Sequence, residues 1–388
     1  MTKRPLLEQM AETLNAKSKN IIYGDRPYPY FSLATFLSGL SIIYGGAVGM
    51  RNRLYRQGRL TTAKLPCPVI SVGNMTLGGT GKTPMTLHLS RLIAKLGFKA
   101  AVISRGYKGC SERKGAIVSD GRSIRLNARQ AGDEPFLLAL LSTGLPVIVG
   151  RNRRASGWNA IRTFQPDVIL LDDAFQHQRL KRDLDLVLLD SKAPFGNTRL
   201  FPRGPLREPV VSLLRADAVI LTRCSASTPV YYDRLVRAVR PRPVFRAFFK
   251  PVVRLTVSSQ TPCYGHLLSA DLQAAAVFPD AKRLFAFSGL AHNQNFWQTV
   301  LERGGDLVGT MAFQDHHNYT SQDMECIVTT ARKHRADRLV TTDKDFVRIP
   351  PGIALPLEMT VMGMRVEFAH PQRWQDFMES RLKQMIQR

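Results

Sequence analysis

The hydrophobic pattern opens with one long stretch that carries no charge. Between Arg26 and Arg51 lie 24 residues without a charged side chain, and prolines near its start leave residues 30–50 as the helix-forming part. These 21 residues, at about 1.5 Å each, extend roughly 32 Å, which is enough to cross the hydrocarbon core of a bilayer. The pattern therefore predicts a membrane-associated helix at about residues 30–57.

A basic segment follows this stretch, and a stripe of small residues runs along it. The basic residues have no acidic residue among them, as at the cytoplasmic boundary of a membrane: Arg51, Arg53, Arg56, Arg59 and Lys64. The stripe recurs at helical spacing: Ser38, Ser41, Gly45 and Gly49. It fits a packing face against the protein or another helix, and equally a helix that lies in the membrane interface. Spanning, interfacial and buried-core arrangements therefore stay open.

From about residue 66, short apolar runs alternate with segments of helical periodicity. The strand candidates are residues 68–72, 100–104, 145–149, 168–171, 184–189 and 218–222, and the first helix candidate is residues 85–96. Short apolar runs with helices between them are typical of a parallel sheet that is covered on both faces. The sequence therefore predicts an α/β fold with a parallel sheet sandwiched by helices.

The pattern changes again near residue 240. Residues 244–257 alternate between apolar and basic or polar side chains, which suits a strand or hairpin with one exposed face. Beyond them lie strand candidates at 283–287 and 338–342 and helix candidates at 293–303 and 321–334. We therefore expect an N-terminal segment (1–60), a core (61–240) and a smaller C-terminal α/β lobe (241–388).

Composition and charge narrow the possible partners. The chain of 388 residues is 44% hydrophobic, which excludes a disordered protein, and its formal net charge of +25 favours phosphate-bearing partners. The five cysteines lie far apart and form no CxxC pair, so we expect neither a zinc site nor a disulfide framework: Cys67, Cys110, Cys224, Cys263 and Cys326. A reducing compartment follows from this cysteine usage.

The strongest motif is SVGNMTLGGTGKTP at residues 71–84, between a predicted strand and a predicted helix. Its glycines let backbone amides curl around a phosphate, Lys82 adds a positive charge, and the Thr83 hydroxyl is placed to bind Mg²⁺. The first glycine of the G-x-x-x-x-G-K-[ST] pattern is replaced by Thr76. We expect a P-loop NTPase-like core whose nucleotide-binding residues are Thr76, Leu77, Gly78, Gly79, Thr80, Gly81, Lys82 and Thr83.

A P-loop also needs an acidic metal contact at the end of a strand. Residues 167–173 read DVILLDD, a buried strand that ends in paired carboxylates, with Gln176 and His177 just beyond. One of Asp172 and Asp173 is expected to bind Mg²⁺ directly and the other to support it, and the sequence does not separate them.

Five further motifs follow the phosphate-binding loop in order: SRGY (104–107), GDEP (132–135), DDAFQH (172–177), GPLREP (204–209) and DHH (315–317). Together with the loop, this series resembles the tetraacyldisaccharide 4'-kinases, the membrane-bound lipid A kinases of Gram-negative bacteria. The resemblance implies ATP-dependent phosphorylation of the 4'-hydroxyl of a tetraacylated glucosamine disaccharide 1-phosphate, giving lipid IVA. It also implies ATP and Mg²⁺ as cofactors and the cytoplasmic face of the inner membrane as the location.

The resemblance further implies roles for individual residues. Lys82 would serve catalysis as well as ATP binding, and Asp133 would be the base towards the sugar hydroxyl with His316 as its partner. Glu208 would join Thr83, Asp172 and Asp173 at the metal. The residues expected to contact substrate or support the site are Arg105, Tyr107, Glu134, His177 and Arg207.

Taken from the residues alone, several of these positions keep alternatives. GDEP is also a common start of a helix, and His317 has almost the same claim as His316. The chain also departs from the family pattern at two points, since Ala174 stands where Gly is usual and residues 342–345 read TDKD where TEKD is commoner. Neither departure removes a reacting group, so they concern local backbone shape.

Two other function classes fit part of the sequence. The basic charge permits a nucleic-acid-dependent ATPase, but the basic residues are scattered and no second motor motif is visible. A nucleotide switch protein at a membrane is the other alternative, although no NKxD guanine motif follows a strand. We therefore expect a lipid substrate and a membrane surface as partners, with no nucleic acid and no obligate protein partner.

Overall fold

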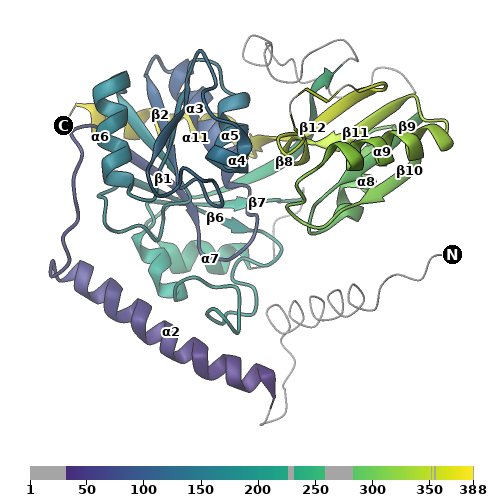
Figure 1. Ribbon diagram of the computed structural model, residues 1–388. Coiled ribbons are helices and arrows are strands. Elements are labelled where there is room, and N and C mark those ends of the chain that lie inside the picture. Colours follow the sequence, from purple (N-terminus) through teal and green to yellow (C-terminus); the bar gives the residue numbers. More distant parts are fainter. Residues whose placement is uncertain (1–31, 226–230, 258–282, 351, 354, 388) are drawn as a thin grey trace. The chain divides into compact units, whose positions relative to one another are not determined.

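The computed structural model describes residues 32–225, 231–257, 283–350, 352–353 and 355–387 (Figure 1). The chain forms two compact units, of which unit 1 comprises Met1–Lys82, Leu171–Phe248 and Phe368–Arg388, and unit 2 comprises Thr83–Leu170 and Phe249–Glu367. The first predicted residues of the N-terminal helix, 30 and 31, and Cys263 lie outside the described residues. The predicted division at residues 60 and 240 stays a prediction.

Helix α2 (Leu33–Arg56) confirms the predicted N-terminal helix. The side chain of Ser32 caps it by accepting a hydrogen bond from the Thr35 amide, and arginines in its last turn suit the negative end of the helix dipole. One face, which includes Ser41 and Val48, is buried, while large apolar side chains elsewhere on the helix are exposed: Leu33, Phe36, Leu40, Ile42, Ile43 and Met50. By length and composition the helix could cross a membrane.

Unit 1 contains a parallel sheet built from buried apolar strands. Its strands are β1 (Val69–Asn74), β6 (Leu184–Asp190), β7 (Ala218–Thr222) and the first residues of β8 (Val244–Val257). They pair in parallel in the order β1, β6, β7, β8, as Figure 1 shows. Strand β5 (Val168–Asp172) ends in this unit. Every residue of β1, β5 and β7 is buried, which confirms the prediction of strands covered on both faces.

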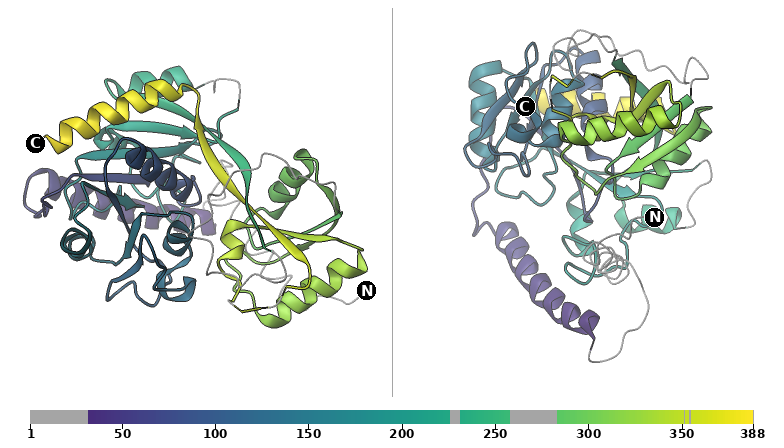
Figure 2. Two further views of the ribbon diagram at one scale, coloured as in Figure 1. Left: turned by 90° about the horizontal axis from the view of Figure 1, so that it is seen from above. Right: turned by 45° about the vertical axis from the view of Figure 1, so that its right-hand side comes forward.

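Three helical elements pack within unit 1: the 3-10 helix η1 (Val210–Arg215), α7 (Tyr232–Val239) and α11 (Pro371–Ile386). Leu213 of η1 and Leu235 of α7 join the core formed with Val187 and Val219 of the sheet. On α11, drawn in yellow in Figure 2, Trp374 stacks on Phe368 and meets the edge of Phe245, which opens β8. The sequence analysis had not predicted α11.

The first part of unit 2 holds a small mixed sheet. Its elements are α3 (Lys82–Lys95), β2 (Ala100–Ser104), β3 (Ala116–Asp120), α4 (Ala128–Ala131), α5 (Asp133–Leu140), β4 (Pro146–Val149) and α6 (Arg153–Phe164). Strands β2 and β4 pair in parallel and match the predicted runs, whereas β3 pairs antiparallel to β4 and was not predicted.

The second part of unit 2 holds another parallel sheet. Its elements are β9 (Arg283–Ser288), α8 (Asn293–Glu302), β10 (Asp306–Ala312), α9 (Ser321–Lys333), β11 (Arg338–Thr342), α10 (Asp343–Phe346) and β12 (Glu358–Phe368). Strand order is β10, β9, β11, β12, followed by β8, and the first three pairs are parallel (Figure 1). The α/β fold class predicted from the sequence is confirmed, although β10 and β12 were missed.

We predict that Trp374→Ala destabilises the protein by about 3–5 kcal/mol, because it removes a buried aromatic side chain and its stacking contact with Phe368. Chemical denaturation followed by circular dichroism measures this change. Trp158→Ala is the matched control, since Trp158 is 40% exposed on α6. Equal effects of the two substitutions would show that the Trp374 contacts do not stabilise unit 1.

Candidate functional site

The turn after β1 has the backbone geometry of a phosphate cradle. Gly78 and Gly81 have φ values of 104° and 85°, a region that suits glycine, and α3 starts directly afterwards at Lys82. The buried Asn74 side chain donates to the carbonyl oxygens of Thr76, at 2.8 Å, and of Gly78, at 3.4 Å. These two bonds hold the carbonyls of the turn in fixed positions, so Asn74 helps to fix the shape that a phosphate needs.

A second side chain braces the middle of this turn. Nη2 of Arg223 donates to the carbonyl oxygen of Gly79 at 2.6 Å, while its Nη1 pairs with Asp190 at 2.8 Å. Arg223 itself lies in the left-handed region with φ 56°. Since Asp190 ends β6 and Arg223 follows β7, two neighbouring strand ends of unit 1 support the turn.

The Asp172–Asp173 pair follows β5 as predicted, and its two members differ. Asp172 is buried at the strand end, whereas Asp173 has a φ of 52° and turns its carboxylate towards two cations. Nη1 of Arg207 lies 2.9 and 3.0 Å from its two oxygens, and Nζ of Lys82 lies 3.8 Å away. This geometry brings together Lys82, Asp173 and Arg207. Position 174 does not require a glycine, because the residue with the left-handed backbone conformation here is Asp173.

The residue types around the turn suit Mg²⁺ bound with a nucleotide. The described residues contain no group of three or more His, Cys, Asp or Glu side chains that would hold a metal on its own. Mg²⁺ in nucleotide sites needs only one or two carboxylates, because phosphate oxygens and water complete its octahedral shell. Two of the residues expected at the metal have buried oxygen atoms: Thr83, in the first turn of α3 in unit 2, and Asp172, at the end of β5 in unit 1.

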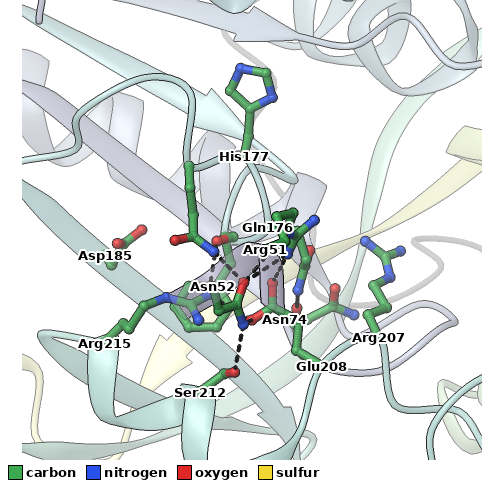
Figure 3. Close-up of polar contacts among 12 residues, drawn as sticks. Arg51, Asn52, Asn74, Gln176, His177, Asp185, Arg207, Glu208, Ser212 and Arg215 are labelled. Atoms are coloured by element: carbon green, nitrogen blue, oxygen red, sulfur yellow. Dashed lines mark hydrogen bonds and ion pairs between the residues drawn. The ribbon is translucent and has the colours of Figure 1, made fainter. Parts of the chain in front are cut away.

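Glu208 lies in a separate network that joins α2 to η1 (Figure 3). Its buried carboxylate accepts from Arg51 at 2.6 Å and from Arg215 at 2.7 Å, and Nδ2 of Asn52 lies 3.3 Å away. The metal role predicted for Glu208 stays a prediction, and both of its oxygens already accept hydrogen bonds. The ring of His177 points away from this network in Figure 3.

Unit 2 carries the second cluster of expected residues. Asp133 starts α5, and its Oδ2 lies 3.3 Å from Nδ1 of His316. Arg348, which follows α10, donates from Nε to the same oxygen at 2.7 Å and lies with Nη2 2.9 Å from the same ring nitrogen. The guanidinium therefore spans both members of the Asp133–His316 pair with one planar fork.

A buried carboxylate holds Arg348 in turn. Asp345 is fully buried, and its oxygens accept hydrogen bonds from the Gly289 amide at 2.9 Å and the Thr342 hydroxyl at 2.6 Å. Nη1 of Arg348 lies 3.5 Å from Asp345, and the Tyr319 hydroxyl donates to the same oxygen. The TDKD segment therefore supplies the anchor of the cluster through its last residue.

The two neighbouring histidines have different surroundings. Nε2 of His317 lies 3.1 Å from Asp323, and its ring stacks on Phe313, so His317 belongs to the cap of α9. His316 instead faces a donor and an acceptor with the same Nδ1. A neutral ring can accept there from Arg348, and a protonated ring can donate to Asp133. The same ring nitrogen therefore lies within reach of both Arg348 and Asp133.

The charges around Asp133 keep its carboxyl group ionised. Burial alone would raise the pKa of Asp133, but the hydrogen bond with His316 and the positive charge of Arg348 outweigh it, so the pKa lies below its ordinary value. Asp133 is therefore a carboxylate at neutral pH.

The SRGY and GDEP motifs meet in unit 2 through close backbone packing. A Cβ on Gly132 would lie 2.8 Å from the Tyr107 carbonyl oxygen, and one on Gly106 would lie 2.9 Å from that of Ala131. Only glycines allow this approach, which sets residues 104–107 beside the start of α5. Arg105 pairs with Glu112 at 2.6 Å, and Tyr107 is exposed. Glu134 follows Asp133 in the first turn of α5.

The sequence analysis did not identify Asn74, Arg223 and Arg348 as site residues. Asn74 lay within a motif that was quoted, and its place just before the loop was the available signal. Arg223 and Arg348 are single arginines in a chain with 55 basic residues, so nothing in the sequence marked them out.

Comparisons with known proteins agree with the motifs. A family model described as tetraacyldisaccharide-1-P 4'-kinase matches residues 33–383. The tetraacyldisaccharide 4'-kinase of Desulfatibacillum aliphaticivorans is 40% identical over 351 residues, covering 89% of this chain and 91% of the relative. That of Syntrophus aciditrophicus is 41% identical over 346 residues, covering 86% and 90%. The crystal structure of LpxK from Aquifex aeolicus in complex with ATP is similar with a TM-score of 0.71 and 28% identity, covering 90% of this chain and 100% of that one.

We predict that Arg348→Gln raises the pKa of Asp133, because burial then acts on the carboxylate without the compensating guanidinium charge. A carboxyl carbon NMR titration of aspartate-labelled protein measures this shift. Arg125→Gln is the control, since Arg125 pairs with Asp120 in the same unit and leaves the Asp133 titration in place. An Asp133 curve that Arg348→Gln does not move would contradict the ion pair.

Proposed function

The chain belongs to the tetraacyldisaccharide 4'-kinase family, and we propose that its phosphate loop and its Asp133–His316 pair carry out the family's phosphoryl transfer. The family's activity is the ATP-dependent phosphorylation of the 4'-hydroxyl of a tetraacylated glucosamine disaccharide 1-phosphate, which yields lipid IVA. The observation that carries the assignment of residues is the glycine turn that leads into Lys82, with Asp173 and Arg207 beside it.

ATP binding follows from the chemistry of the turn. Phosphoryl transfer asks mainly for positioning and for neutralisation of charge on the transferred group. Backbone amides of the turn, other than the Leu77 amide that donates to the Pro205 carbonyl, and the ammonium group of Lys82 supply both. Lys82 lies 3.8 Å from Asp173, and the phosphate oxygens of a nucleotide would be further partners for its ammonium group.

Mg²⁺ is the metal that this donor set fits. Thr83 and one of Asp172 and Asp173 would hold it, and Asp173 has the competing contact with Arg207. When bound, Mg²⁺ supplies positive charge that offsets the charge developing on the phosphate oxygens. Arg207 and Lys82 add fixed positive charge on the protein side.

Proton transfer is the task of the Asp133–His316 pair. The acceptor hydroxyl must lose its proton as the phosphoryl group arrives, and a positioned carboxylate or imidazole can take it. Asp133 is ionised for this purpose, and its Oδ2 lies 3.3 Å from Nδ1 of His316. Arg348 keeps both groups in place.

Helix α2 supports attachment to the cytoplasmic face of the inner membrane, and we propose that it lies along the membrane surface. The Ser41 hydroxyl donates to the Leu200 carbonyl and the Tyr44 hydroxyl to the Arg207 carbonyl, each at 2.8 Å, so one face of the helix is bonded to the protein. The apolar side chains on its outer face are exposed, and basic residues follow them. A helix with one face bound to protein and one apolar face fits the interface better than a free span.

We predict that Lys82→Ala and Asp133→Asn fail at different steps. Lys82→Ala loses affinity for Mg²⁺·ATP and, with it, turnover, because the phosphates lose their cation. Asp133→Asn keeps ATP affinity within about threefold but lowers kcat by about 10²-fold or more, because the proton acceptor is neutralised. Calorimetry with a non-hydrolysable ATP analogue and lipid phosphorylation followed by mass spectrometry give the two readouts. A proportional loss of ATP affinity in Asp133→Asn would make Asp133 a nucleotide contact.

We further predict that Ile43→Asp lowers vesicle binding about tenfold or more, since burying an apolar side chain of this size is worth about 1.5–3 kcal/mol. Ile43 is 71% exposed on α2. Flotation with vesicles that contain anionic lipid measures the binding. Leu301→Asp, on α8, is the matched control, because Leu301 is also an exposed apolar residue. Equal losses in both variants would argue against a membrane role for the outer face of α2.

A further inference from the structure

Residues 199–212, here called the coupling segment, contact both α2 and the phosphate loop within unit 1. The segment folds back on itself, because the Gly204 amide donates to the Leu200 carbonyl at 2.8 Å and the Leu206 amide to the Arg199 carbonyl at 3.1 Å. Gly204 sits so close to Arg199 that any Cβ would overlap its backbone. The segment is therefore a compact loop that is bonded to itself.

The contacts with α2 run along almost the whole segment. Besides its bond to the Leu200 carbonyl, the Ser41 hydroxyl accepts from the Arg203 amide at 2.9 Å. The Tyr44 hydroxyl donates to the carbonyl of Arg207. Two turns later, Arg51 pairs with Glu208 at 2.6 Å, as Figure 3 shows. The helix is thus bonded to the coupling segment through Ser41, Tyr44 and Arg51.

The opposite side of the segment is bonded to the phosphate loop. The Leu77 amide donates to the Pro205 carbonyl at 2.7 Å, and the Arg207 amide donates to the Met75 carbonyl at 2.8 Å. The side chain of Arg207 then reaches Asp173, beside Lys82. Arg207 consequently receives a bond from α2 at its carbonyl and makes bonds to the nucleotide site with its amide and its guanidinium.

The Glu208 ion pair holds this arrangement at its most buried point. Glu208 is fully buried and lies between Arg51 and Arg215, and Asn52 contributes a third contact. Gln178, from the segment after β5, donates to Asn52 at 2.6 Å. Removing one partner of a buried ion pair is strongly destabilising, so the loss of Arg51 favours a rearrangement around Glu208. Since Glu208 is adjacent to Arg207 in the chain, such a movement displaces Arg207.

We propose that α2 is part of the nucleotide site, with Arg51 and Tyr44 acting as positioning residues that hold Arg207 against Asp173 through the coupling segment. This proposal extends the proposed function. It takes from it only the identity of the nucleotide, ATP. It assigns the membrane helix a role beyond attachment, because a change in its seating reaches the groups that bind phosphate.

The test is direct binding of Mg²⁺ with a non-hydrolysable ATP analogue to full-length protein in nonionic detergent, measured by calorimetry. Arg51→Ala is expected to raise Kd about tenfold and Tyr44→Phe about threefold, since each removes a bond to the segment. Arg51→Lys should restore Kd to within about twofold, because it returns the cation. The thermal unfolding midpoints of Tyr44→Phe and Arg51→Lys should match the wild type.

Ser38→Ala is the matched control. The Ser38 hydroxyl bonds to the Ala34 carbonyl of its own helix, so its removal should leave Kd unchanged. Unchanged Kd in both Arg51→Ala and Tyr44→Phe would overturn the proposal, and if Arg51→Ala does not fold, Tyr44→Phe decides alone. The same holds if Ser38→Ala weakens binding as much as Tyr44→Phe. The assay measures nucleotide binding without a lipid acceptor. Its result therefore tests this proposal even if the protein proves not to phosphorylate the lipid.

Discussion

Carboxylates paired with arginines hold three parts of the candidate site, and in two of the pairs one partner is buried. Arg207 binds Asp173, Arg348 binds Asp133, and Arg51 with Arg215 binds Glu208. Removing one partner of a buried pair costs about 3–5 kcal/mol, because the remaining charge is left without compensation. These pairs therefore fix positions within about one hydrogen-bond length, which phosphoryl transfer requires. Arginine suits the task better than lysine because its planar fork reaches two acceptors at once.

The same pairs explain how a chain with a net charge of +25 can stay folded and selective. Some of its arginines are used internally, as anchors for Glu208 and Asp133, and do not act as general anion binders. Others remain at the surface near the end of α2, where anionic headgroups are the natural counter-ions. The excess charge thus has one use in shaping the site and, under the proposed membrane attachment, a second in meeting a phosphate-rich surface.

The sequence predicted most of the parallel strands but only part of the site. Strands β2, β7 and β11 have the predicted bounds, since buried parallel strands are continuous apolar runs. Strand β12 was missed because Gly363 and Arg365 interrupt its apolar pattern. The loop around Lys82 was predictable because its chemistry is local. The Arg348 fork was not, since it depends on a contact across 215 residues of chain that no local pattern encodes.

The two-faced character of α2 also decides how the protein can be handled. Deleting the helix to obtain a water-soluble fragment would remove the exposed apolar surface. It would also remove Arg51 and Asn52 from Glu208 and take away the Ser41 and Tyr44 hydroxyls that donate to the Leu200 and Arg207 carbonyls. The fragment would gain solubility but lose contacts that cover the buried Glu208. A better route keeps the helix and replaces only its exposed apolar side chains, so that the hydrogen bonds and ion pair between α2 and the coupling segment stay intact.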